Sequence, residues 1–175
     1  MASFKYKGQL NGAENPICVD IIVGASGTIT VGGAVIMDSL SNGGGVLAAT
    51  TGIAITGICV GLYKDQIPLE NVDAATLAGA YTKSTQVFVA TSTNTTVDMV
   101  YAKVVVDPMA LWENDSAGNL ALADEYKYFD LLSATQIANQ DGHDTAGTFQ
   151  LIRRDVDDAS KGTFRIAESK LYSIV

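Results

Sequence analysis

Short runs of β-branched and other apolar residues, separated by glycine-rich or polar turns, recur along this chain. In the first third they are residues 17–23, 28–37, 46–49 and 53–63. Gly-Ala-Ser-Gly at 24–27 predicts a short turn between the first two runs, and Thr51-Gly52 predicts a turn between the last two. Residues 53–58 alternate with a period near two, which is typical of a strand in a barrel or sandwich wall.

The rest of the chain continues this pattern with little sign of helix. Further strands are predicted over residues 86–90, 97–106, 148–154 and 163–175. The Ala-rich segment 69–81 allows a short helix capped near Asn71, and segment 126–140 fits either a short helix or an irregular connection. Many short strands with glycine-rich turns predict an all-β fold, a small β-barrel or sandwich with minor short helices.

One segment predicts a specific local structure. The run Val104 to Val106 enters Asp107-Pro108, and the apolar pair Leu111 and Trp112 follows. Proline fixes its own φ at about −65° and favours extended geometry in the residue before it, so the chain should turn here. We therefore predict strand, corner, strand, with Trp112 as a core anchor.

Aromatic and basic residues alternate near the amino terminus as Phe4, Lys5, Tyr6 and Lys7. They form either an ordinary first strand or an arm that adds to the sheet edge of a neighbouring molecule. On the second interpretation, residues 1–15 are an N-terminal arm that binds a partner, and residues 16–175 are one β-rich domain. Phe4 and Tyr6 would then lie outside the core.

Composition and charge narrow the choice of partners. Hydrophobic residues make up 47% of the 175 residues and charged residues 17%, which suggests that a partner protein covers some apolar surface. The net charge of −8 argues against nucleic acid. Residues 39–63 carry no charge, but their many glycines and threonines argue against a membrane span. The start lacks the apolar region of a signal peptide, which predicts a protein made in the cytoplasm.

Candidate chemistry in the sequence is sparse, and we expect no enzyme, cofactor or metal site. Cys18 and Cys59 lack metal-ligand spacing and are predicted to be buried thiols. The glycine-containing run at 21–31 continues as a strand, whereas a dinucleotide site needs a helix there. Asp155, Asp157 and Asp158 fit a hairpin tip better than a cation loop, which would need Gly and Glu positions that are missing. The single histidine, His143, is predicted to be a solvated loop residue.

The corner resembles the Val-x-Asp-Pro-x-x-Leu-Phe-Glu pattern of small proteins that decorate or cement the heads of tailed bacteriophages. The matching positions are Asp107, Pro108, Leu111 and Trp112, with Trp112 where phenylalanine is commoner. Asn114-Asp115 stands in place of the usual Ile-Gln. The Gly- and Val-rich segment 17–63 is similar to the opening module of that group.

This resemblance implies a non-enzymatic virion protein on the outer capsid surface, often a homotrimer, that clamps neighbouring major capsid protein subunits. A tail, connector or fibre-base component of the virion is the alternative. A small hydrolase with His143 as base is a third hypothesis, although no Gly-x-Ser-x-Gly elbow accompanies that residue.

Overall fold

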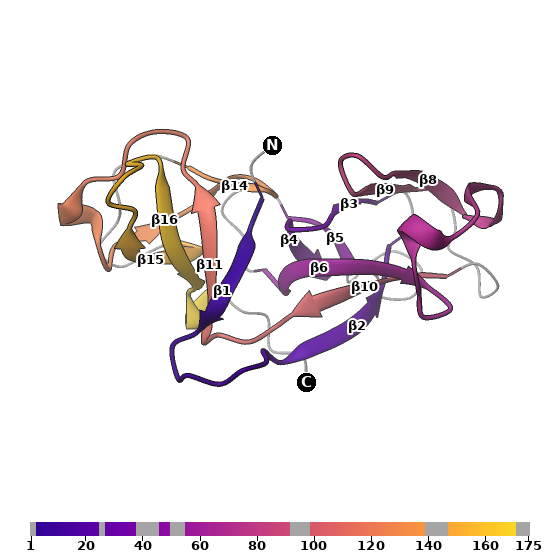
Figure 1. The fold of residues 1–175 in the computed structure, drawn as a ribbon, viewed down its shortest axis with the longest axis horizontal. Coiled ribbons are helices and arrows are strands. Elements are labelled where there is room, and N and C mark those ends of the chain that lie inside the picture. The colour runs from indigo at the N-terminus through magenta and orange to yellow at the C-terminus, as the bar shows by residue number, and fades with distance from the viewer. Residues whose placement is uncertain are drawn as a thin grey trace.

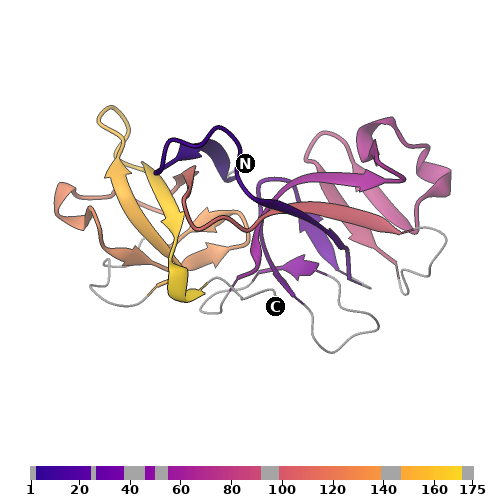
Figure 2. The same ribbon diagram turned by 90° about the horizontal axis from the view of Figure 1, so that it is seen from below.

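Antiparallel strands make up most of the protein, in two lobes that lie side by side (Figure 1). The computed structural model describes residues 3–24, 27–37, 46–49, 55–91, 99–138 and 147–170. The sheets curl in a barrel-like manner (Figure 2), and the expected all-β fold class is confirmed.

One lobe is built on a five-stranded antiparallel sheet. Its strands, in spatial order, are β1 (Lys5–Gln9), β11 (Ala110–Asp115), β16 (Lys161–Ile166), β15 (Phe149–Arg154) and β12 (Tyr128–Phe129). A two-stranded ribbon, β13 (Leu131–Ser133) with β14 (Gln136–Ile137), belongs to the same lobe.

The other lobe combines a six-stranded and a three-stranded sheet. The larger sheet runs in the order β2 (Cys18–Ile22), β10 (Val100–Val105), β6 (Gly57–Lys64), β4 (Ala34–Met37) and β5 (Val46–Ala48), with β7 (Ile67–Pro68) paired to β6. The smaller sheet runs in the order β3 (Thr28–Thr30), β9 (Val87–Ala90) and β8 (Gly79–Thr82).

The buried side chains form two clusters, one on each side of the six-stranded sheet. Val104 and Cys59 belong to the cluster shared with the three-stranded sheet, for which Phe88 and Ile29 supply the other wall. Val105 belongs to the cluster shared with the five-stranded sheet. Neighbouring residues of β10 therefore face opposite cores, as the alternation of side chains along a strand requires.

Aromatic rings fill the core of the five-stranded sheet. Phe4 stacks on Phe149 with ring centroids 4.7 Å apart, and Phe129 meets Phe164 edge to face at 6.0 Å. Trp112 is fully buried and pairs in register with Tyr6 on one side and Phe164 on the other. The prediction that Trp112 anchors the core is confirmed.

Several expectations about strand pairing are wrong. The runs before and after 24–27 do not form a hairpin, because β2 pairs with β10 and β3 pairs with β9 in another sheet. Strands β5 and β6 both pair with β4 and lie on either side of it. In neither case do the two runs that flank the predicted turn pair with each other.

The predicted helices also differ from the structure. The helical segments of the described chain are four 3₁₀ turns of three residues, namely η1 (Leu69–Asn71), η2 (Ala74–Thr76), η3 (Leu122–Asp124) and η4 (Glu168–Lys170). The side chain of Asp73, rather than Asn71, caps η2 by accepting from the Ala75 N–H. None of the helices described is long and apolar enough to cross a membrane.

Only one of the two cysteines is buried. Cys59 lies in the core, where desolvation raises the pKa of its thiol to about 12. Cys18 is exposed at the start of β2, contrary to expectation, because β2 is an edge strand and this side chain faces away from the core. Both thiols are free.

We expect Trp112→Ala to lower the free energy of unfolding by about 3–5 kcal/mol, because it leaves a large cavity between Tyr6 and Phe164. Trp112→Phe should cost much less, since it keeps a ring there and the indole N–H has no hydrogen-bond partner among the described residues. Urea denaturation of both variants measures the difference. An unchanged midpoint for Trp112→Ala would contradict the core role.

Candidate functional site

The Asp-Pro corner lies where the chain passes between the two lobes, and the Asp107 side chain holds it there. Oδ2 of Asp107 accepts hydrogen bonds from Nε2 of Gln9 at 2.7 Å and from the backbone N–H of Ile17 at 3.2 Å. Its Oδ1 accepts from the N–H of Met109 at 2.9 Å, and its carbonyl accepts from the N–H of Ala110 at 3.1 Å. One buried carboxylate therefore ties together both connections between the lobes, β1 to β2 and β10 to β11.

The structure brings the two sets of predicted site residues together in neighbouring strands. Strand β1 pairs with β11, so that Lys5 lies opposite Glu113 and Tyr6 lies opposite Trp112. The Tyr6 and Trp112 rings meet edge to face with centroids 5.7 Å apart. Pro108 and Leu111 are half-buried beside this pairing.

The arm predicted over residues 1–15 differs from the structure. Phe4 is only 4% exposed and lies in the aromatic core, and residues 5–9 form a strand of the protein's own sheet. The ordinary first strand, the other interpretation of this segment, is what forms. The physical reason is that Phe4 stacks on Phe149 in the aromatic core, while Tyr6 contacts the Trp112 ring and stays 37% exposed.

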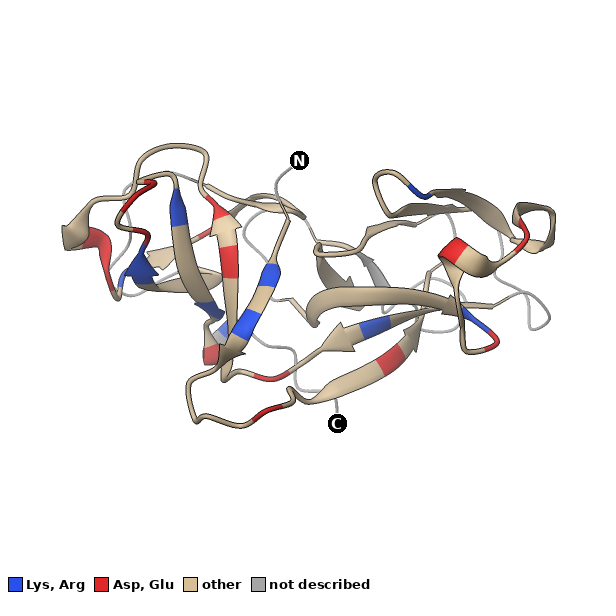
Figure 3. Cartoon of the chain, in the orientation of Figure 1, with Lys and Arg blue, Asp and Glu red and all other residues tan. Residues whose placement is uncertain are grey.

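The outer face of the five-stranded sheet carries alternating charges. Basic positions on β1 and β16 flank acidic positions on β11 (Figure 3). Nζ of Lys7 donates to Oε2 of Glu113 at 2.8 Å. This hydrogen bond lowers the pKa of the Glu113 carboxyl and raises the pKa of the Lys7 ammonium. The basic and acidic side chains of this face therefore largely neutralise one another.

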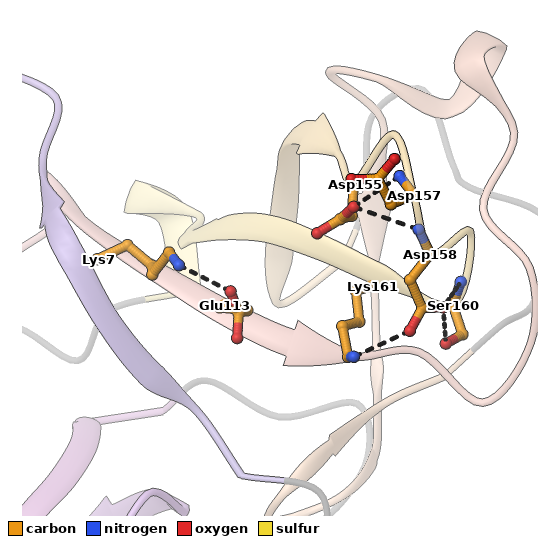
Figure 4. A network of polar contacts seen from close by, with 7 residues as sticks. All are labelled: Lys7, Glu113, Asp155, Asp157, Asp158, Ser160 and Lys161. Carbon is orange, nitrogen blue, oxygen red and sulfur yellow. Dashed lines mark hydrogen bonds and ion pairs between the residues drawn. The ribbon is translucent and has the colours of Figure 1, made fainter.

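The acidic tip of the β15–β16 hairpin is a self-contained turn (Figure 4). Oδ1 of Asp155 accepts from the N–H groups of Asp157 and Asp158, at 2.8 and 3.2 Å. Oδ1 of Asp158 accepts from the N–H and the hydroxyl of Ser160, and its Oδ2 lies 2.9 Å from Nζ of Lys161. The Asp155 and Asp158 carboxylates therefore accept hydrogen bonds from the turn's own backbone and side chains. Among the described residues there is no group of three potential metal ligands.

The free edge of β1 has features that disfavour pairing with another strand. A β-bulge lies between Tyr6 and Gly8, and it leaves Lys7 without a partner in the register. Gly8 adopts φ +132°, a conformation open to glycine. Lysines and bulges on edge strands protect them against strand addition. The partner-binding role predicted for Phe4, Lys5, Tyr6 and Lys7 is therefore not favoured at this edge.

The free edge of β2 has neither a β-bulge nor a lysine. Its register with β10 is regular over five residues, from Cys18 opposite Val105 to Ile22 opposite Tyr101. Asp20 is its single charged residue. Within the described chain, β10 is the only strand that pairs with β2.

The hydrogen bonds at the two ends of β2 show which of its backbone groups are free. The carbonyl of Ile17 accepts from Val106, and the N–H of Val23 donates to Val100. Because hydrogen-bonded and non-hydrogen-bonded pairs alternate in an antiparallel ladder, the odd-numbered residues bond to β10. The backbone groups of Cys18, Asp20 and Ile22 therefore point to the free edge.

Two exposed apolar side chains lie near the Asp107 corner, one just after β1 and one just before β2. Ile17 is 62% exposed and Leu10 is 46% exposed, and both lie beside the Asp107 corner through backbone hydrogen bonds. We call the β2 free edge together with Leu10 and Ile17 the junction edge. The apolar run at 17–23 is visible in the sequence. Whether the strand lies at a sheet edge depends on strand order, which the sequence analysis did not predict.

The remaining candidate residue, His143, lies outside the described residues. Comparisons with protein-family models, curated proteins and solved structures found no match for this chain.

We expect Asp107→Ala to lower the free energy of unfolding by about 2–3 kcal/mol, because it leaves partly buried donors without an acceptor. The amide protons of Ile17 and Met109 should also exchange faster, as measured by hydrogen exchange. Asp107→Asn keeps one acceptor oxygen and should cost less. Unchanged stability and unchanged exchange in Asp107→Ala would show that the carboxylate does not hold the junction.

Stability should depend on the charge of Asp158 in a defined pH range. The hydroxyl of Ser160, then Lys161 and the Ser160 N–H, lower the pKa of Asp158 from 3.8 to about 2. A lowered pKa stabilises the fold above the unfolded value of 3.8, and this contribution disappears as pH falls toward 2. Asp158→Asn should therefore be less stable than the wild type at neutral pH and equally stable near pH 2.

Thermal unfolding across this pH range measures the effect. Asp157→Asn is the matched control, since the Asp157 carboxylate accepts no hydrogen bond from the described residues. A stability difference for Asp158→Asn that does not change with pH would contradict the assignment.

Proposed function

We propose that this protein is a non-enzymatic structural component of a tailed-phage virion that binds the outer capsid surface and stabilises contacts between major capsid protein subunits. The observation that carries the proposal is the junction edge, where β2 has a regular register, no lysine and, among the described residues, no strand on its free side. An edge of this kind suits strand addition, in which backbone hydrogen bonds supply affinity and neighbouring side chains supply specificity.

The corner supports the phage resemblance in a physical sense. Asp107 and Pro108 together build the passage between the lobes, and Trp112 fills the core directly after it. The residues on which the resemblance rests thus determine architecture, which suits a motif of structural proteins. We also propose that the protein forms a homotrimer, as the resemblance implies.

The acidic charge suits an outer-surface position, because a chain with net charge −8 is repelled by packaged DNA. Many copies bound at once would also strengthen one another, since the engagement of one subunit raises the effective concentration of its neighbours. Weak contacts at each junction edge are therefore sufficient to stabilise a capsid.

A deletion of the gene tests the function. Particles that lack this protein should assemble but release DNA at a lower temperature, and adding back purified protein should restore the release temperature. Equal release temperatures for wild-type and deletion particles, with intact infectivity, would refute the cement role. Heads that fail to join tails would instead support a tail, connector or fibre-base component, the alternative function.

A matched pair of substitutions at Cys18 tests the junction edge in the same assay. Cys18→Pro removes an N–H that points to the free edge while keeping the ladder with β10, and proline is tolerated at the first residue of an edge strand. Cys18→Ser keeps that N–H. We expect both variants to fold, Cys18→Ser to occupy heads normally and Cys18→Pro to show at least about tenfold weaker binding, a loss of roughly 1.4 kcal/mol. Equal occupancy would remove the junction edge as the contact.

A further inference from the structure

A second surface with binding chemistry lies on the six-stranded sheet, on the face of β10 and β6 that carries their tyrosines. It is a groove of about 570 Å³, within the range of small-molecule sites. Six residues line it: Asp20, Tyr63, Asp65, Gln66, Tyr101 and Lys103. They come from β2, β6, β10 and the turn between β6 and β7.

Two tyrosines supply the aromatic part of the groove. Tyr63 and Tyr101 lie directly opposite each other in the ladder between β6 and β10. The Tyr63 ring lies over Gly61, where an added Cβ would come within 2.6 Å of its Cε2 atom. A glycine at 61 thus leaves room for this ring against the sheet. Both tyrosines are half-buried, so that each retains exposed ring surface.

Polar groups of both signs surround the rings. Lys103 lies opposite Asp20 in the register, and its Nζ lies 5.4 Å from the centroid of the Tyr63 ring. Asp65 and Gln66 are exposed in the turn between β6 and β7. The groove therefore offers ammonium and amide donors, carboxylate and amide acceptors, and phenol hydroxyls around an aromatic surface.

The turn that presents Asp65 and Gln66 is strained. It joins the paired residues Lys64 and Ile67, and φ is +50° at Asp65 and +64° at Gln66. Two-residue hairpin turns with positive φ at both positions favour Asn-Gly, because glycine adopts this geometry without steric cost. Non-glycine residues held in such a conformation concentrate at functional sites.

We propose that this groove binds a neutral oligosaccharide. Tyrosine rings contact the apolar faces of sugar rings, and a mixed set of donors and acceptors matches sugar hydroxyls. An anionic ligand fits less well, because two carboxylates and one ammonium leave the groove with a net negative charge. Tyr101 supplies the main stacking surface, and Asp65 and Gln66 hold hydroxyl groups at the rim. This activity is independent of the proposed virion role.

The test uses the purified full chain, without capsids, so that its outcome is separate from the capsid experiments. Maltohexaose, cellohexaose, chitohexaose and mannohexaose are titrated while amide chemical shifts are recorded by NMR. We expect at least one of them to bind with a Kd on the order of 1 mM or tighter. Its largest shifts should occur at Tyr63, Gln66 and Tyr101. The absence of shifts with all four sugars, or shifts confined to other surfaces, would overturn the proposal.

Variants separate binding from folding. Tyr101→Ala should weaken binding at least about tenfold, whereas Tyr101→Phe keeps the ring and should bind nearly as well as the wild type. Tyr126→Ala is the matched control, since Tyr126 is 67% exposed in the other lobe, and it should bind normally. Wild-type affinity in Tyr101→Ala would contradict the proposal.

Gln66→Gly gives the sharpest readout, because we expect it to increase the stability of the protein and to decrease its affinity for the sugar. Relief of the left-handed backbone should raise the melting temperature, while loss of the amide should weaken sugar binding several-fold. A purely structural turn would show the first effect without the second, and that result would remove Gln66 from the site.

Discussion

The architecture depends on one buried carboxylate at the junction of the lobes. Asp107 accepts hydrogen bonds from the end of β1 and from the residue before β2, while its own backbone forms the turn between β10 and β11. Both connections between the lobes are thereby fixed in one place. The register of β1 on β11 and of β2 on β10 then follows, and with it the packing of the aromatic core and the position of the β2 edge.

The sequence predicts local structure well where steric rules act on neighbours in the chain. Proline geometry predicts the corner at Asp107-Pro108, and a large apolar residue just after it predicts a buried Trp112. Runs of β-branched and apolar residues predict strands at 17–23, 53–63 and 97–106, close to β2, β6 and β10. The fold class follows from these signals taken together.

Strand partners could not be predicted in the same way, because alternation specifies a face and leaves the neighbour open. The hydrogen bond between Gln9 and Asp107 joins residues 98 positions apart, and no local pattern reports it. The sequence leaves Phe4 and Tyr6 open between a first strand and an arm, since their aromatic partners, Phe149 and Trp112, lie more than 100 positions away along the chain. The groove of Tyr63 and Tyr101 could not be predicted for the same reason, because these tyrosines become neighbours only when β6 pairs with β10.

The two edge strands beside the junction show how one chain treats equivalent edges differently. Strand β1 carries a bulge and two lysines, while β2 is regular and nearly uncharged. Six of the eleven basic residues lie on β1, β15 and β16, so basic charge gathers on one sheet despite the acidic total. The two edges therefore differ in how readily another strand could pair with them.

The path of the chain through the junction also bears on how the protein folds. The segment from β2 to β10 is inserted between two strands that are neighbours in the five-stranded sheet, and its ends, Cys18 and Val105, are paired. Pairing β1 with β11 in an unfolded chain would close a very long loop, as the 106 positions between Lys7 and Glu113 indicate. Once the inserted segment has folded, its ends lie side by side and most of that loop entropy is already lost. The topology therefore favours an order in which the middle of the chain folds first and the two ends assemble upon it.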